Sequence, residues 1–242
     1  MDFGITNADC LEGMKSLPDE SVHLVATDPP YGVGYVSNRR KKVQVPGGVV
    51  DASENTDDVV RAVENDAKWD PDWFEEVVRS CHRILAQDTH VYIFGSDHVI
   101  AEQKKIIQAH FTFKNLIVWD KGVHTAGDLD GAYGKQTEFI IFAQKGRRPL
   151  KGGRPANLIS VDKVPPDRLL HSCQKPVALM SFLIEHSTDP GEIVCDPFAG
   201  SGSTMLAATG LGRKFVGWEI DPRTYQIAVK RLFDDQIQMK LF

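Results

Sequence analysis

Four consecutive residues carry groups that could hold and orient an aromatic amine: Asp28, Pro29, Pro30 and Tyr31. They follow the apolar run Val22–Thr27, which predicts a strand, and ligands of α/β sheets bind beyond the carboxyl ends of the strands. The Asp28 carboxylate and the Pro29 carbonyl could each accept one N–H of an exocyclic amino group, while the prolines stiffen the turn. The Tyr31 ring could stack on a base turned out of a nucleic acid helix. A plain Asp-Pro turn at a strand end is the alternative interpretation.

A second motif is a glycine-rich turn between an apolar strand and a helix. It consists of Asp196, Pro197, Phe198, Ala199, Gly200, Ser201 and Gly202. Glycines let a ligand approach the main chain closely, so the turn predicts a nucleoside cofactor. It is not a phosphate-binding P-loop, because no lysine precedes Ser203-Thr204. A dinucleotide fingerprint is also incomplete, because Met205 stands where the third glycine would be. A turn that serves only the fold is the alternative.

Glu219 ends the next apolar strand. It lies about 20 residues after the glycine-rich turn, where an acidic side chain can accept hydrogen bonds from ribose hydroxyls. Acidic residues at strand ends are common, so the prediction depends on the coupling of Glu219 to the turn.

Together these features resemble the amino-methyltransferases of DNA over nearly the whole chain. Asp28–Tyr31 matches the catalytic D/N/S-P-P-Y/F/W motif of that family. Asp196–Thr204 matches its D-P-F-x-G-S-G-T-T cofactor motif, with Ser203 where threonine is more usual. The catalytic motif precedes the cofactor motif, as in the β group of the family. The resemblance implies S-adenosylmethionine as cofactor and a circularly permuted, Rossmann-like α/β fold.

The resemblance also implies roles for residues outside the two motifs. The cofactor-binding residues that it adds are Asp9, Cys10, His171, Lys175 and Ile220. Asp9 corresponds to an acidic residue near the cofactor adenine, and His171 and Lys175 match an H-x-x-x-K-P element that helps to hold the methionine end. The segments Trp119–Lys121 and Glu138–Phe142 resemble strands at the far side of the catalytic pocket.

The resemblance implies direct attack of a flipped-out base on the methyl group, with no metal. Methylation at cytosine C5 needs a cysteine nucleophile, in that family within a Pro-Cys dipeptide that this sequence lacks. Cytosine-N4 enzymes more often begin the catalytic motif with serine, so Asp28 favours adenine N6, with cytosine N4 as the alternative. Two rivals belong to other classes. A non-catalytic DNA-binding module is opposed by the intact Asp28–Tyr31, and a nicotinamide-dependent oxidoreductase by the missing third glycine.

The expected partner is double-stranded DNA, although the net charge of the chain is -5. An enzyme that grips a few phosphates needs only local basic patches. Two patches predict DNA contacts: Arg39, Arg40, Lys41 and Lys42, and the pair Arg147 and Arg148. They lie in two irregular segments, 32–68 and 122–170, which we expect to be DNA-recognition insertions in a single methyltransferase domain, 1–242. Solvated surface is the alternative interpretation.

The alternation of apolar runs with helical patterns predicts a mostly parallel sheet of seven strands. The expected strands are Ile5–Ala8, Val22–Thr27, His90–Phe94, Lys114–Trp119, Glu138–Ala143, Ile193–Cys195 and Phe215–Trp218. Helices are expected after Asp70-Pro71, Pro176 and Pro222, because proline suits the first turn of a helix. The two strands before Gly146 are expected to form an antiparallel hairpin at the sheet edge.

Scattered cysteines, the lack of a membrane-length apolar run and the lack of a secretory signal favour a cytoplasmic protein of bacterial or phage type. The segment Gln238–Phe242 resembles the Q-x-x-L-F peptide that docks bacterial replication proteins on the sliding clamp. The alternative is that Leu241 and Phe242 fold back on the domain. The oligomeric state stays open, a homodimer included.

Overall fold

The computed structural model describes residues 3–31, 42–45, 48–51, 69–124, 130–171 and 173–240. The chain divides into two compact units, one formed by Met1–Pro29 with Asp70–Phe242 and the other by Pro30–Trp69. Within the smaller unit, strands β3 (Lys42–Val45) and β4 (Gly48–Asp51) pair antiparallel.

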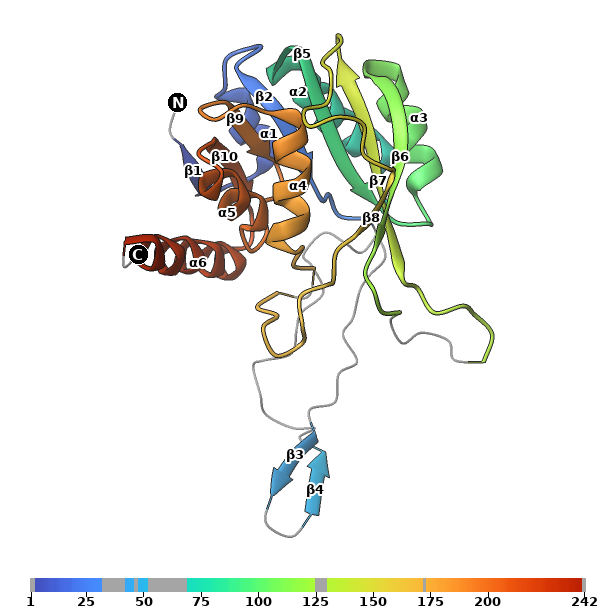
Figure 1. Ribbon diagram of the computed structural model, residues 1–242, viewed down its shortest axis with the longest axis vertical. Coiled ribbons are helices and arrows are strands. Elements are labelled where there is room, and N and C mark those ends of the chain that lie inside the picture. The colour runs from blue at the N-terminus through green and yellow to red at the C-terminus, as the bar shows by residue number, and fades with distance from the viewer. Residues whose placement is uncertain are drawn as a thin grey trace. The chain divides into compact units, whose positions relative to one another are not determined.

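The larger unit is built on one mixed sheet of eight strands in the order β1-β10-β9-β2-β5-β7-β6-β8 (Figure 1). The strands are β1 (Gly4–Asn7), β2 (Val22–Thr27), β5 (Leu85–Gly95), β6 (Thr112–Asp120), β7 (Thr137–Lys145), β8 (Leu158–Ser160), β9 (Ile193–Asp196) and β10 (Lys214–Glu219). Neighbouring strands are parallel except where β7 pairs antiparallel with β5 and β6. The carboxyl ends of the parallel strands and the start of β7 therefore share one rim of the sheet.

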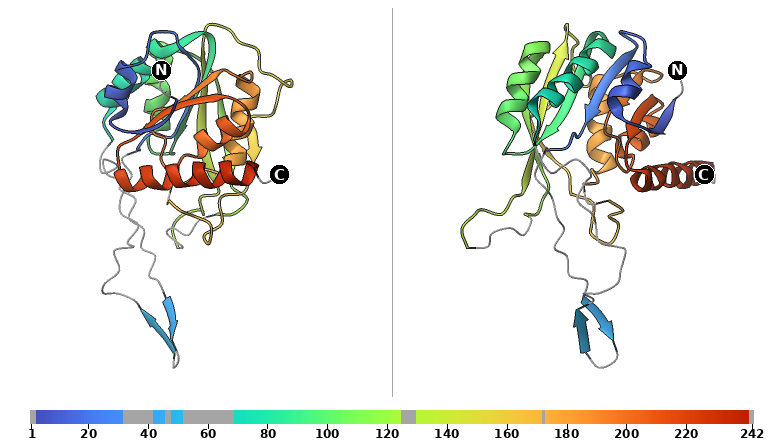
Figure 2. Two further views of the ribbon diagram at one scale, coloured as in Figure 1. Left: turned by 90° about the vertical axis from the view of Figure 1, so that its left-hand side faces the viewer. Right: turned by 180° about the vertical axis from the view of Figure 1, so that it is seen from behind.

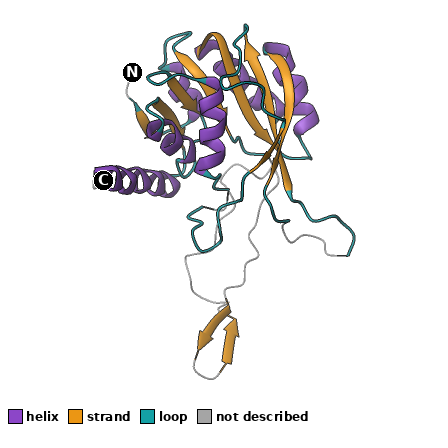
Figure 3. Ribbon diagram, viewed as in Figure 1, coloured by secondary structure: helices purple, strands orange, loops and turns teal. Residues whose placement is uncertain are grey.

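Helices cover both faces of this sheet (Figures 2 and 3). One face carries α1 (Cys10–Lys15), α2 (Pro71–Ile84) and α3 (Ile100–His110), and the other carries α4 (Val177–Ser187) and α5 (Ser203–Gly210). The last helix, α6 (Pro222–Lys240), contacts α5, β1 and β10. With a helical layer on each side, the central strands are largely buried, and five of the six residues of β2 are buried.

Local sequence signals explain why α2 begins where it does. The Asp70 carboxylate accepts hydrogen bonds from the main-chain N–H groups of Asp72 and Trp73, at 3.1 Å each, and Pro71 occupies the first turn. One face of α2 is fully buried and consists of Phe74, Val77, Val78, Cys81 and Ile84. The expected helices after Pro176 and Pro222 are confirmed as α4 and α6.

The predicted seven-stranded sheet is wrong by one strand, although all seven expected strands are present. The eighth strand, β8, has three residues, of which only Ile159 is buried, so its sequence carries no periodic signal. β8 pairs with β6, so the expected β6-β7 hairpin is confirmed but does not lie at the sheet edge. The short α1 and the weakly patterned α3 were not predicted either.

The two segments that we expected to be insertions differ. Residues 32–68 lie within the smaller unit, but Arg39, Arg40 and Lys41 are outside the described residues, and only the main chain of Lys42 is described. Residues 122–170 contain β7 and β8, so this segment is not an insertion as a whole. In the described part of the chain, no helix is both long enough and apolar enough for a membrane crossing.

Gly13 decides how closely α1 lies against the sheet. A Cβ added at Gly13 would come within 2.1 Å of the Trp218 indole on β10. We therefore expect Gly13→Ala to lower the free energy of unfolding by about 1–3 kcal/mol, although alanine is the better helix former. Urea unfolding measures this loss. The control is Gly210→Ala in α5, where a Cβ meets nothing within 4 Å, and equal stability of the two variants would contradict the expectation.

Candidate catalytic and cofactor site

The two sequence motifs meet at the point where the strand order reverses. Neighbouring strands β9 and β2 continue to β10 on one side and to β5 on the other. Such a switch point opens a crevice beyond the carboxyl ends of the strands, where α/β proteins bind ligands. Asp28 follows β2 and Phe198 follows β9, so both motifs reach this crevice.

The Asp196 carboxylate ties the motifs together inside the protein. Its Oδ1 accepts hydrogen bonds from Thr27 Oγ1 at 2.6 Å and from the N–H of Phe198 at 3.1 Å, and its Oδ2 accepts from Thr204 Oγ1 at 2.6 Å. Burial raises the pKa of Asp196 to about 6, although these donors oppose the shift. Because Asp196 is 3% exposed and its partners are protein groups, it shapes the cofactor turn from within.

The glycines of the turn are needed for its conformation. Gly200 and Gly202 have φ values of 53° and 82°, in the left-handed region that favours glycine. A Cβ at Gly202 would approach Met205 Cε to 3.0 Å and Ala228 Cβ to 3.1 Å. The left-handed φ values and the close neighbours of Gly202 therefore both favour glycine in this turn.

Two acidic residues line the neighbouring strand ends. Glu219 accepts hydrogen bonds from the N–H groups of Gly200 at 3.0 Å and Asp221 at 2.8 Å, and burial raises its pKa. Asp9 caps α1 by accepting from the N–H groups of Leu11 and Glu12. Glu219 thus contacts the cofactor turn through Gly200, and Asp9 lies after β1, the strand next to β10.

Three other residues that we predicted to bind the cofactor are described by their burial and hydrogen bonds. Cys10 is 5% exposed, and burial raises the pKa of its thiol to about 12, so a neutral side chain packs in the core. Ile220 is 49% exposed. His171 Nδ1 accepts a hydrogen bond from the N–H of Cys173 at 3.3 Å, and burial lowers the pKa of the ring.

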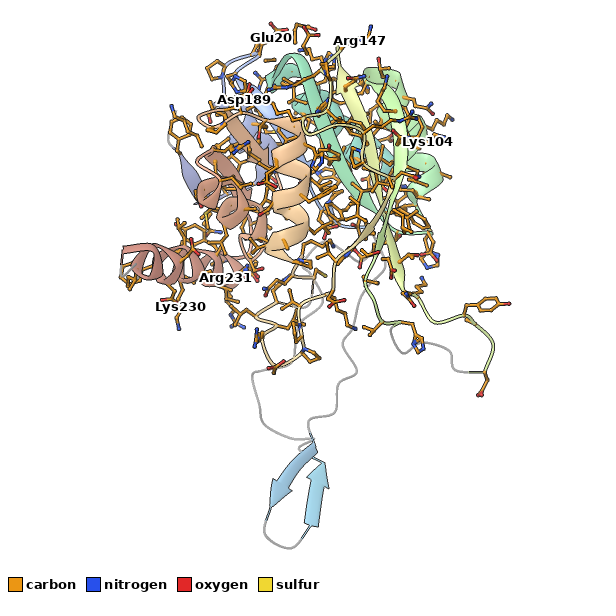
Figure 4. The ribbon with its side chains drawn as sticks, viewed as in Figure 1. Glu20, Lys104, Arg147, Asp189, Lys230 and Arg231 are labelled. Carbon is orange, nitrogen blue, oxygen red and sulfur yellow. The ribbon has the colours of Figure 1, made fainter. Side chains whose placement is uncertain are left out.

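The last helix also holds the cofactor turn, which sequence reasoning missed. Arg231 of α6 donates from Nη1 to the Ser201 carbonyl at 2.5 Å and to the hydroxyls of Ser201 at 3.1 Å and Ser203 at 3.3 Å. Its neighbour Lys230 is exposed and lies on the outer side of the helix (Figure 4). The sequence carries no signal that separates the two residues, because both are basic and adjacent in α6.

Asp28 begins a series of four side chains with alternating charge, which continues away from the cofactor turn. Lys175 Nζ donates to Asp28 Oδ2 and lies 3.2 Å from Glu138 Oε2, while Lys121 Nζ donates to Glu138 Oε1 at 3.3 Å. Burial opposes the charge on Lys175, yet the carboxylates hold its pKa well above the usual value. Burial likewise opposes the charge on Glu138, yet the two ammonium groups hold its pKa below the usual range. Lys175 and Glu138 therefore both carry charge. We call these four residues the charge chain.

The remaining catalytic motif residues divide between the two units. Pro29 is buried and belongs to the larger unit, whereas Pro30 and Tyr31 belong to the smaller one. In the described residues, no group of three or more His, Cys, Asp or Glu side chains is arranged to hold a metal ion.

Arg147 and Arg148, which we predicted to contact DNA, do not lie beside the catalytic motif. They follow β7 at the end of the sheet opposite to Asp28, where Figure 4 shows Arg147 and Asp189. The Arg148 guanidinium is 15% exposed and pairs with Glu192 at 2.7 Å and Asp189 at 3.4 Å. Arg148 is therefore bound to acidic neighbours and faces away from the crevice.

Comparisons with known proteins agree with this geometry. The model of the N6/N4 methyltransferase family, described as "DNA methylase", matches residues 22–230. The DNA adenine methyltransferase YhdJ of Escherichia coli strain K12 is 30% identical, over 94% of this chain and 82% of that protein. The crystal structure of the M1.HpyAVI-SAM complex is 25% identical, with a TM-score of 0.64 over 94% of this chain and 98% of that chain. The cytosine-N4-specific PvuII DNA methyltransferase, 18% identical, shares the fold with a TM-score of 0.70 over 93% of this chain and 84% of that chain.

The raised pKa of Asp196 makes the stability of the protein depend on pH. Between the ordinary carboxyl value of 3.8 and about 6, the folded state holds a proton on Asp196 that the unfolded state has lost. The contribution of this group to the free energy of unfolding therefore falls as pH rises from about 4 to about 6. Asp196→Asn keeps the shape and removes this titration. Unfolding of both proteins across this range measures the difference, and a constant difference would contradict the assignment.

Loss of the Arg231 guanidinium should loosen the cofactor turn. We expect Arg231→Met to weaken binding of S-adenosylhomocysteine by about tenfold, because the Ser201 carbonyl and two hydroxyls lose a charged donor. Isothermal titration calorimetry measures the affinity. Lys230→Met is the matched control on the next residue, and equal affinities of the two variants would show that Arg231 does not support the turn.

Proposed function

This chain belongs to the DNA methylase family, and we propose that it transfers the methyl group of S-adenosylmethionine to N6 of adenine in double-stranded DNA. One observation carries the proposal: Thr27, beside the catalytic motif, is hydrogen-bonded to Asp196, which shapes the cofactor turn. This hydrogen bond would hold the position for an amine beside the position for a methyl donor at the switch point.

The residues of the rim suit S-adenosylmethionine. Gly200 and Gly202 give the turn its left-handed conformation, Glu219 would accept hydrogen bonds from the ribose hydroxyls, and Asp9 would lie near the adenine. When bound, this cofactor supplies an electrophilic methyl group on a sulfonium sulfur.

The catalytic motif would orient the nucleophile. The Asp28 carboxylate and the Pro29 carbonyl accept the two N–H bonds of the amino group, which aims the nitrogen lone pair at the methyl carbon. The nitrogen would take the methyl group from the sulfonium sulfur, which would keep the S–C electron pair, and the surplus N–H proton would leave afterwards to Asp28 or to water. Tyr31, two residues beyond Pro29, would stack on the flipped base. Positioning and electrostatics supply the rate, because no covalent intermediate is needed.

Adenine is favoured over cytosine by two observations. The motif begins with Asp28, and YhdJ, which is 30% identical, is a DNA adenine methyltransferase. Methylation of cytosine N4 is the second candidate, because the same arrangement of acceptors can hold either exocyclic amine.

DNA contacts are proposed for the smaller unit, whose basic run Arg39–Lys42 suits phosphates. A DNA substrate and four free cysteines suit a bacterial cytoplasm. Docking of Gln238–Phe242 on a sliding clamp stays a prediction, as does a homodimer. The main chain of α6 is helical as far as Lys240, while Leu241 and Phe242 are outside the described residues.

The decisive test is methyl transfer from radiolabelled S-adenosylmethionine to unmethylated genomic DNA, followed by nucleoside analysis. We expect N6-methyladenine as the product. In Asp28→Ala and Asp28→Asn the rate of methyl transfer should fall by at least about 100-fold, because the amine loses its charged acceptor. Both variants should still bind S-adenosylhomocysteine.

Other products of this test would contradict the proposal in different ways. N4-methylcytosine would keep the mechanism and overturn the choice of base. If the DNA stays unlabelled although the protein binds the cofactor, the methyltransferase proposal is overturned and a DNA-binding module is favoured.

A further inference from the structure

Lys175 touches both halves of the site through different parts of the residue. Its carbonyl accepts a hydrogen bond from Ser203 Oγ at 2.7 Å, at the start of α5 behind the cofactor turn. Its side chain runs the other way and ends on Asp28 and Glu138. Pro176 follows directly and precedes the first turn of α4, which limits how the main chain can move here.

The direction of the side chain argues against contact with the cofactor. In the sheet, the order β9-β2-β5-β7 places the cofactor turn after β9. The Lys175 ammonium lies on Asp28 after β2, 5.0 Å from the ring centre of Phe94 in β5, and beside Glu138 in β7. Each of these three contacts lies on the side of the switch point away from the turn.

The burial of these charges points to a role beyond stability. The Lys175 side chain is 11% exposed, Asp28 19% and Glu138 31%. Removing such charges from water costs free energy, and buried ion pairs add little net stability compared with apolar packing. What the pair does provide is a fixed orientation of the carboxylate.

We propose that Lys175 is a positioning residue that holds the Asp28 carboxylate toward the target amine, and that Glu138 and Lys121 orient Lys175 in turn. This inference rests on the proposed function and replaces the role at the methionine end that the family resemblance implied. Lys175 neither touches the amine nor takes its proton. It fixes one oxygen of Asp28, so that the carboxylate cannot rotate away from the attacking nitrogen.

Glu138 acts on Lys175 through charge. The distance from Lys175 Nζ to Glu138 Oε2 is that of an ion pair, although Oε2 makes no hydrogen bond among the described residues. Lys121, which is 9% exposed in its side chain, holds the other oxygen of Glu138. Lys121, the residue after β6, thus holds Glu138 in place, and the negative charge of Glu138 attracts the Lys175 ammonium to its position beside Asp28.

The test separates catalysis from cofactor binding. A misplacement of about 1 Å can cost about 100-fold in rate, so we expect Lys175→Met to lower kcat by about that factor. Its affinity for S-adenosylhomocysteine, measured by calorimetry, should change less than about threefold, because the main-chain contact to Ser203 remains. Lys175→Arg keeps the charge and should recover about tenfold of the lost rate.

Two further variants keep the test informative if Lys175→Met does not fold. Glu138→Gln leaves Lys175 in place but weakens its orientation, and we expect a loss of about tenfold in kcat with unchanged cofactor affinity. Lys151→Met breaks another lysine–aspartate pair, with Asp189 at the opposite end of the sheet, and should leave kcat unchanged.

The results that would overturn the inference are distinct from failure of the proposed function. Wild-type kcat in Lys175→Arg and Glu138→Gln, and in Lys175→Met if it folds, would overturn the positioning role while leaving methyl transfer intact. An affinity for S-adenosylhomocysteine about tenfold weaker in Lys175→Met, with unchanged kcat at saturation, would make Lys175 a cofactor ligand instead. If the wild-type protein binds S-adenosylhomocysteine but methylates no DNA, the proposed function itself is contradicted.

Discussion

The buried hydrogen bond between Thr27 and Asp196 is the constraint on which the site depends. It joins the end of β2 to the end of β9 across 169 residues of sequence. A carboxylate held out of water needs partners, and Asp196 takes them from Thr27, Thr204 and the main chain of Phe198. Satisfying this one side chain fixes the distance between the catalytic motif and the cofactor turn.

Two kinds of electrostatic arrangement meet at the switch point. On the cofactor side, single carboxylates accept hydrogen bonds from main-chain N–H groups, as Glu219 does from Gly200 and Asp221. On the catalytic side, carboxylates are paired with ammonium groups in the charge chain. The first arrangement shapes loops, and the second holds ionised groups at fixed positions in a region of low dielectric constant. Lys175 contacts both sides, because its carbonyl accepts a hydrogen bond from Ser203 and its side chain belongs to the charge chain.

The sequence predicts those features that local rules determine. The motifs at Asp28 and Gly200 could be placed at strand ends because apolar runs precede them and glycine and proline limit the main chain. The helix at Pro71 could be predicted because its cap and its buried face are both local.

Features that depend on distant partners could not be predicted in this way. β8 forms only because β6 offers an open edge, and its three residues carry no pattern. Arg148 belongs to a basic cluster in the sequence, but the fold brings Glu192 to it from 44 residues away. The partners of Lys175 are equally remote, because Asp28 is separated from it by 147 residues. In each case the sequence shows the type and charge of the residue, but not which distant residue the fold brings into contact with it.

The separation of the two motifs along the chain also bears on synthesis of the protein. The catalytic motif leaves the ribosome well before Asp196 and Arg231, which complete the cofactor turn. Contacts between residues so far apart form slowly, because a long loop must close first. Until residue 231 is free, the nascent chain carries the groups for an amine and no finished place for the methyl donor. The two halves of the site are therefore joined only after residues 28 to 231 have all been synthesised.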